Sequence, residues 1–213
     1  MDVNQDRDEI AAKSAVACWF KMELPFVTAI QQQQLDGQLL DRWLVYWVLA
    51  RTIRRPNRDE LRVFLADVAR PALLAVQRLG PEAYRLVEEL SIRALRSSVV
   101  TGRPTSLISK FAFSCRPKIF VPYDRRARCA LRRSGYKIPD HAYGVYMEAF
   151  NAEKKRTIER LYAHGIRASN LPYQGQTMND ELFEMRVADR CLMLHGGFSA
   201  SYMTRDYSQS DFI

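Results

Sequence analysis

The residues best suited to chemistry lie between positions 103 and 137, where one lysine and one aspartate stand out in a basic segment. The segment holds ten lysines and arginines and a single acidic residue, Asp124. Lys110 precedes this aspartate in the run Ser106-Leu-Ile-Ser-Lys110. A lone carboxylate among cations has two interpretations. It is either a helix cap on a nucleic-acid-binding face or a catalytic group that works beside a phosphate backbone.

The composition of the whole chain is that of a globular protein with a surplus of positive charge. The chain has 213 residues, 47% of them hydrophobic and 26% charged, and its net charge is +8. This excludes global disorder and points weakly to a polyanionic partner. The length predicts a single domain, or two packed subdomains, over residues 1–197, with a polar tail over 198–213.

Neither a metal site nor a membrane segment is expected. The four cysteines have no CxxC spacing, so we expect no metal ion and no cofactor. The N-terminal residues are polar, and no apolar run is long enough to span a bilayer. We therefore expect a cytoplasmic protein associated with the nucleoid, with no membrane and no obligatory protein partner.

Hydrophobic residues recur at helical spacing and strand patterns are nearly absent, so the sequence predicts an all-α fold. Pro71 is expected to kink or split one helix, and Asp124 is expected at or near the N-cap of another. The expected helices cover residues 9–20, 26–34, 38–54, 58–79, 82–100, 105–114, 124–134, 140–163 and 179–194.

Two motifs carry a resemblance to a known family. One is Ser106-Leu-Ile-Ser-Lys110 followed by Pro117-Lys-Ile-Phe-Val-Pro-Tyr-Asp124; the other is Arg186-Val-Ala-Asp189-Arg-Cys-Leu192. Together they resemble the helix-hairpin-helix DNA glycosylase superfamily, in particular its 8-oxoguanine-glycosylase-like prokaryotic branch. The match covers about residues 104–131 and the late motif. The preceding hundred residues match only as a set of helices, and the usual hairpin is replaced by Val100-Thr-Gly-Arg-Pro-Thr-Ser106.

The resemblance implies that the protein flips a damaged or modified base out of double-stranded DNA. It would then hydrolyse the N-glycosidic bond and leave an abasic site. Asp124 would stabilise the positive charge that builds up on the deoxyribose; a helix cap alone is the alternative. Lys110 keeps three interpretations: an amine that attacks C1′ and gives lyase activity, an ammonium that holds a phosphate or the Asp124 carboxylate, or an exposed helix lysine.

The other candidate residues fall into a DNA-binding set and a base-pocket set. For the first set, a merely solvated basic face is the alternative. For the tryptophans of the second set the alternative is core packing, and for Asp189 it is a buried ion pair with Arg186, three residues earlier on the same helix face. The DNA-binding set is Arg103, Ser106, Ser109, Arg116, Lys118, Arg125, Arg126, Arg128 and Arg132, continued by Arg133 and Lys137; the base-pocket set is Trp43, Trp47, Asp189, His195 and Phe198.

The role and the class of protein stay open at this point. The resemblance suggests either repair of 8-oxoguanine or defence against phages by excision of modified bases from their DNA. A rival class is a non-catalytic helical protein that binds DNA or RNA through the same basic face. A third is a helical interaction domain whose basic segment meets an acidic protein.

Overall fold

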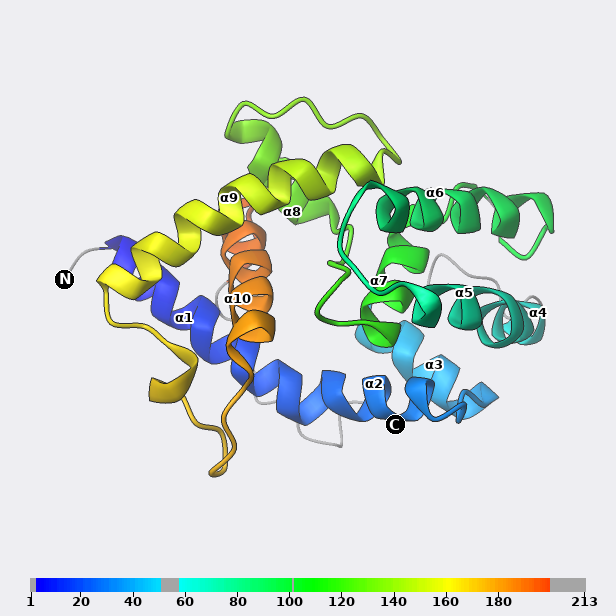
Figure 1. Ribbon diagram of the computed structural model, residues 1–213, viewed down its shortest axis with the longest axis horizontal. Helices are drawn as coiled ribbons and strands as arrows, with labels where there is room; N and C mark the ends of the chain where they lie inside the picture. Colours follow the sequence, from blue (N-terminus) through cyan, green and yellow to red (C-terminus); the bar gives the residue numbers. More distant parts are fainter. Residues whose placement is uncertain (1–2, 51–57, 101, 200–213) are drawn as a thin grey trace. The chain divides into compact units, whose positions relative to one another are not determined.

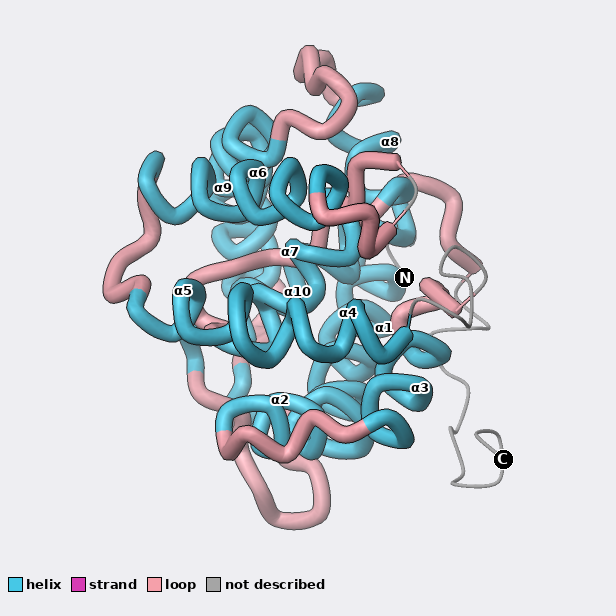
Figure 2. The backbone as a smooth tube through the Cα atoms, turned by 90° about the vertical axis from the view of Figure 1, so that its right-hand side faces the viewer, coloured by secondary structure: helices cyan, strands magenta, loops and turns pink. Residues whose placement is uncertain are grey.

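The described chain is built from helices, as a computed structural model shows for residues 3–50, 58–100 and 102–199. Within these ranges Figure 2 shows helices joined by loops and no strand, and the one β-type pairing is an isolated bridge between Tyr173 and Gln176. The prediction of an all-α fold is therefore confirmed. The expected polar tail lies outside the described residues from position 200 onward.

Most of the expected helices are present, with altered ends (Figure 1). The α-helices are α1 (Val3–Cys18), α2 (Leu24–Gln31), α3 (Gly37–Tyr46), α4 (Arg58–Val63), α5 (Arg70–Ala75), α6 (Pro81–Arg96), α7 (Thr105–Cys115), α8 (Arg125–Arg133), α9 (Tyr143–Ala163) and α10 (Asp180–His195). The described ranges also contain two wider π-helical segments, η1 (Trp19–Glu23) and η3 (Phe64–Ala69), and a short 3₁₀ turn, η4 (Ala168–Asn170).

Two long helix predictions are wrong in part. The helix expected over 38–54 ends at Tyr46, because Trp47 is the C-cap and Val48 has a φ of 55°, a left-handed conformation that a β-branched residue rarely adopts. Residues 51–57 of that prediction lie outside the described chain. The helix expected over 58–79 is divided by η3 and ends at Ala75, and Pro71 stands in the first turn of α5, where its missing N–H costs nothing.

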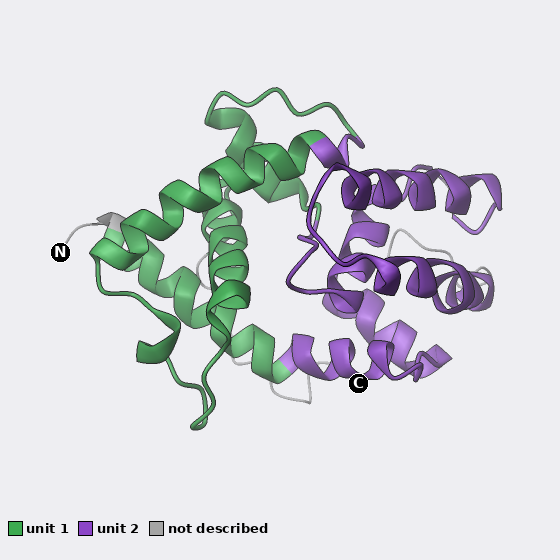
Figure 3. Ribbon diagram, viewed as in Figure 1, with its two compact units in different colours: residues 1–21, 123–140, 145–208 green, residues 22–122, 141–144, 209–213 purple. Residues whose placement is uncertain are grey.

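The chain divides into two compact units (Figure 3). Unit 1 consists of residues 1–21, 123–140 and 145–208, and unit 2 consists of residues 22–122, 141–144 and 209–213. One of the points at which the chain passes from one unit to the other falls between Pro122 and Tyr123, inside the segment that carries the candidate residues.

Unit 2 is built around α7, a helix with almost no polar face. Ten of its eleven residues are buried, and α2, α5 and α6 pack against it. Trp43 of α3 is completely buried and donates from Nε1 to the Ser114 hydroxyl oxygen at 3.0 Å. After α7, the connection to position 122 is held by Tyr143, whose hydroxyl donates to the carbonyl oxygen of Val121 at 2.9 Å and accepts from its N–H at 3.1 Å.

Unit 1 is organised by α10, which packs against both α1 and α8. Its N-cap is Asn179, whose side chain accepts from the N–H of Leu182. The junction with α1 contains a buried acid, Asp8, whose two carboxylate oxygens accept from Arg160 of α9 at 2.7 and 2.9 Å. The Cys191 thiol of α10 lies 3.7 Å from the same carboxylate.

Candidate functional site

Asp124 begins α8. Its backbone is extended, with φ −92° and ψ 143°, and its Oδ1 accepts from the N–H of Arg126 at 2.8 Å. This confirms the N-cap prediction. The carboxylate is half-buried and lies at the end of the helix where the unpaired N–H groups and the dipole favour negative charge. The same position suits a group that must stay anionic beside a developing cation.

The helix that Asp124 begins is held against the end of α10 by a close backbone contact. Gly196 follows α10, and a Cβ added there would meet the Arg126 carbonyl oxygen and come within 2.5 Å of its carbonyl carbon. Two arginines of α8 reinforce the contact. Arg126 donates to the carbonyl oxygen of Gly197, and Arg133 donates to that of His195 at 2.8 Å. A side chain at position 196, even that of alanine, would force the two backbones apart.

Arg186 and Asp189 form a completely buried ion pair inside α10. Each residue is 1% exposed, and Arg186 Nη1 donates to Asp189 Oδ2 at 2.7 Å. The ion-pair interpretation of the late motif is thereby confirmed. The second oxygen, Oδ1, is buried and accepts no hydrogen bond from any residue in the described ranges.

Asp189 also interacts electrostatically with Asp124. Burial raises the pKa of the Asp189 carboxyl, Arg186 and Arg190 lower it, and the negative charge of Asp124 raises it further. The net direction is upward, since desolvation is the largest of these effects. Unit 1 thus holds two interacting acids. The Asp124 carboxylate is half-buried at a helix end, and its charge raises the pKa of the buried Asp189 carboxyl.

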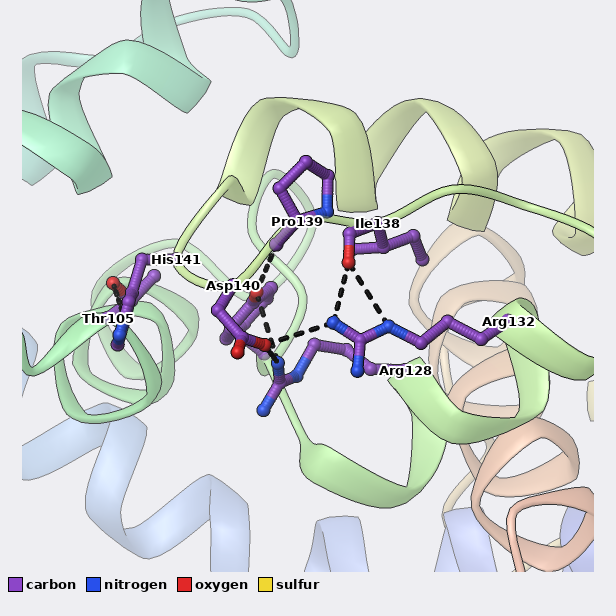
Figure 4. A network of polar contacts seen from close by, with 8 residues as sticks. Thr105, Arg128, Arg132, Ile138, Pro139, Asp140 and His141 are labelled. Carbon is purple, nitrogen blue, oxygen red and sulfur yellow. Dashed lines mark hydrogen bonds and ion pairs between the residues drawn. The ribbon is translucent and has the colours of Figure 1, made fainter.

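The arginines on the other side of α8 bind an acid instead of facing solvent alone (Figure 4). Arg128 and Arg132 donate to the same oxygen of Asp140, at 2.8 and 3.0 Å. Hydrogen bonds from Arg132 and Arg128, and then their charges, hold the pKa of the Asp140 carboxyl below its usual range. The expected phosphate contacts therefore have an intramolecular partner, which the sequence analysis missed because Asp140 was expected to be an ordinary helix start.

Lys110 lies in unit 2, inside α7. It is 6% exposed, its Nζ donates to the carbonyl oxygen of Trp47 at 3.1 Å, and the ammonium lies 5.7 Å from the centre of the Trp47 ring. The interpretation of Lys110 as an exposed helix lysine is therefore wrong, whereas its two active interpretations stay predictions. Asp124 belongs to unit 1.

Two other candidate residues, Ser109 and Trp43, are buried in the core of unit 2. Ser109 is completely buried and donates to the carbonyl oxygen of Ser106 at 3.0 Å, so its hydroxyl is turned away from any DNA phosphate. Trp43 is a core residue whose indole N–H is bound to Ser114, which confirms the core interpretation and leaves no edge for a base. Trp47 is half-buried.

The remaining candidates keep some exposure. Phe198 is half-buried with the Arg126 guanidinium 5.4 Å from its ring centre. His195 is exposed at the end of α10; partial desolvation, followed by the charges of Arg160 and Arg7, places its pKa below the usual range. In unit 2 the side chains of Arg103, Ser106 and Arg116 are half-buried and Lys118 is exposed, and Arg125 of unit 1 is exposed as well.

No family model, curated protein or solved structure matches this chain. Among the described residues, no group of three histidine, cysteine, aspartate or glutamate side chains is arranged to hold a metal ion. None of the helices in the described ranges is long and apolar enough to cross a membrane.

Proposed function

We propose that this protein is a DNA glycosylase with the helix-hairpin-helix type of fold, which extrudes a damaged or modified base and hydrolyses its N-glycosidic bond. The observation that carries the proposal is the position of Asp124, a half-buried carboxylate at the positive end of a helix whose sequence is otherwise basic. The motif resemblance around Lys110 and Asp124 supports it. The net charge of +8 supports DNA as the polyanionic partner.

The proposed reaction uses Asp124 as an electrostatic stabiliser. As the bond from C1′ to the base nitrogen breaks, its electron pair leaves with the base and positive charge builds on the sugar. A carboxylate beside C1′ is favoured more strongly in that state than in the ground state, and this difference lowers the barrier. Water then adds to C1′ and loses a proton, the base gains one, and an abasic site remains.

The test compares wild type with Asp124→Asn on DNAs that carry different damaged or modified bases, with abasic sites counted by an aldehyde-reactive probe. Asparagine is as good an N-cap as aspartate, so the variant keeps the bond to the Arg126 N–H and loses only the charge. We expect base release to fall at least about a hundred-fold, the usual cost of removing one preorganised electrostatic group.

Asp36→Asn is the matched control. Asp36 is also an N-cap: it begins α3 and accepts from the N–H of Leu39 at 2.7 Å, so the variant loses the same charge at a helix start in unit 2. It should leave base release unchanged. Trapping with borohydride separates the two active interpretations of Lys110, because only a Schiff base formed by an amine on the sugar gives a covalent complex.

The opposite outcome has a definite meaning. If no DNA yields abasic sites with the wild-type protein, and DNA binding is the same in wild type and Asp124→Asn, the enzyme proposal is wrong. Asp124 is then a cap alone, and the protein is a non-catalytic nucleic-acid-binding protein.

A further inference from the structure

One carboxylate oxygen in unit 1 is shared by two guanidinium groups while the carboxylate itself stays open to solvent. Asp140 Oδ1 accepts from Arg128 Nη1 at 2.8 Å and from Arg132 Nη2 at 3.0 Å (Figure 4). The Asp140 side chain is 70% exposed, against 18% for Arg128 and 43% for Arg132. Of the three side chains, the Asp140 carboxylate is therefore the most exposed to solvent.

Arg132 is oriented by contacts that do not involve Asp140. Its Nε and Nη2 donate to the carbonyl oxygen of Ile138 at 3.1 and 2.6 Å. This pairing of two N–H groups with one backbone oxygen fixes the plane of the guanidinium. Nη2 of Arg132 also donates to Asp140 Oδ1.

Arg128 is oriented in a similar way by an aromatic ring. Its guanidinium carbon lies 4.4 Å from the centre of the Tyr123 ring, and Tyr123 is fixed in turn by donating from its hydroxyl to the Pro139 carbonyl oxygen at 3.2 Å. Stacking on an aromatic face holds an arginine while leaving its N–H edge available. Both guanidinium groups are thus preorganised around one anionic oxygen.

We propose that Arg128 and Arg132 form a binding site for a single DNA phosphate, which Asp140 occupies in the free protein and leaves when DNA binds. A phosphate oxygen accepts the same charge-assisted hydrogen bonds as a carboxylate oxygen. Exposed ion pairs contribute little to stability, so the carboxylate is readily exchanged, whereas a DNA phosphate also releases condensed counterions. The inference rests on the proposed function only in taking DNA as the partner.

The test measures binding of a short fluorescein-labelled duplex by anisotropy at several salt concentrations. Asp140→Asn removes the competing charge, and we expect binding to tighten about two- to five-fold, the factor that corresponds to releasing an exposed ion pair. Replacing both Arg128 and Arg132 by glutamine should weaken binding and reduce the slope of log K against log salt by about 0.9, the value for one phosphate.

Two comparisons separate this site from a general effect of charge. Glu159→Gln removes an exposed carboxylate from α9 in the same unit, so it changes the net charge as Asp140→Asn does without touching the arginines. It should tighten binding less. In the background with both arginines replaced, Asp140→Asn should no longer tighten binding more than Glu159→Gln does.

The inference is overturned if Asp140→Asn and Glu159→Gln have equal effects in the wild-type background, a comparison that does not need the arginine variants to fold. It is also overturned if the advantage of Asp140→Asn persists without the arginines. Base release distinguishes this outcome from failure of the proposed function. Tightened binding without abasic sites supports the phosphate site alone, and abasic sites without the Asp140 effect support the glycosylase alone.

Discussion

Replacement of Gly196 by alanine tests the contact that holds α8 against α10. The backbone at Gly196 has φ −77° and ψ 0°, a conformation that alanine adopts freely. On that basis alone, alanine would stabilise the protein by about 0.4–1 kcal/mol through the unfolded state. The added Cβ, however, would come within 2.5 Å of the Arg126 carbonyl carbon, and ordinary van der Waals contact begins at 3.4 Å.

The two backbones must therefore separate by about 1 Å or more. That movement stretches the bond from Arg133 to the His195 carbonyl oxygen, now 2.8 Å, and disturbs the bond from Arg126 to Gly197. Overpacking of this kind costs about 1–3 kcal/mol. With the gain in the unfolded state subtracted, we expect a net loss of about 1–2 kcal/mol, because the obstructing atoms belong to the backbone and cannot change rotamer.

The assay is thermal and urea denaturation of wild type, Gly196→Ala and the control Gly37→Ala. For a chain of this length the expected loss lowers the Tm by about 2–8 °C. Gly37 opens α3 and has no atom within 4 Å of an added Cβ, so its substitution should leave the Tm unchanged or slightly raised. A Gly196→Ala protein as stable as wild type, or more stable, would refute the close contact between α8 and α10.

Two further outcomes follow from the polar contacts. Tyr143→Phe leaves the buried N–H and carbonyl groups of Val121 without their shared partner, so the free energy of unfolding should fall by about 1–3 kcal/mol in urea denaturation; an unchanged value would contradict the contact. The Asp140 carboxyl, whose usual pKa is 3.8, should titrate below that value because of Arg132 and Arg128, so its contribution to stability is complete only well above pH 3.8 and is lost as the pH falls through the lowered pKa. Carboxyl-carbon NMR should show this shift and its removal by high salt, and a pKa at or above 3.8 would contradict the pairing.

Local signals in the sequence were enough for much of the helical layout. Asp124 and Asn179 cap α8 and α10 as expected for residues whose side chains accept from the first turn of a helix. The end of α3 was not predictable in this way. Apolar residues continue past Tyr46, and the helix stops only because Val48 has a left-handed backbone conformation. The π-helical segments were not predictable from the sequence either. In η1, for example, Glu23 is buried and accepts a hydrogen bond from the hydroxyl of Tyr46, a contact that spacing along the chain does not reveal.

In the candidate site, too, contacts within one helix were predictable and contacts between separate segments were not. The Arg186–Asp189 pair was predictable because residues three apart share a face of one helix. The contact of Gly196 with Arg126 and the pairing of Arg128 with Asp140 join residues that the helical pattern treats separately. For Lys110, exposure was one of three interpretations left open by the sequence, and it fails because its helix is buried on nearly every side.

The division of the sequence between the two units has a consequence for the order of folding. Nearly all of unit 2 lies in one stretch, residues 22–122, whereas unit 1 joins α1 to segments that come after it, and Asp8 and Arg160 are 152 positions apart. During synthesis, unit 2 therefore has its partners long before α1 has any. Completion of unit 1 must close a loop that contains unit 2, and the entropy cost of that closure is smaller once unit 2 is compact. Docking of α10 onto α1 is then a late event in the folding of unit 1.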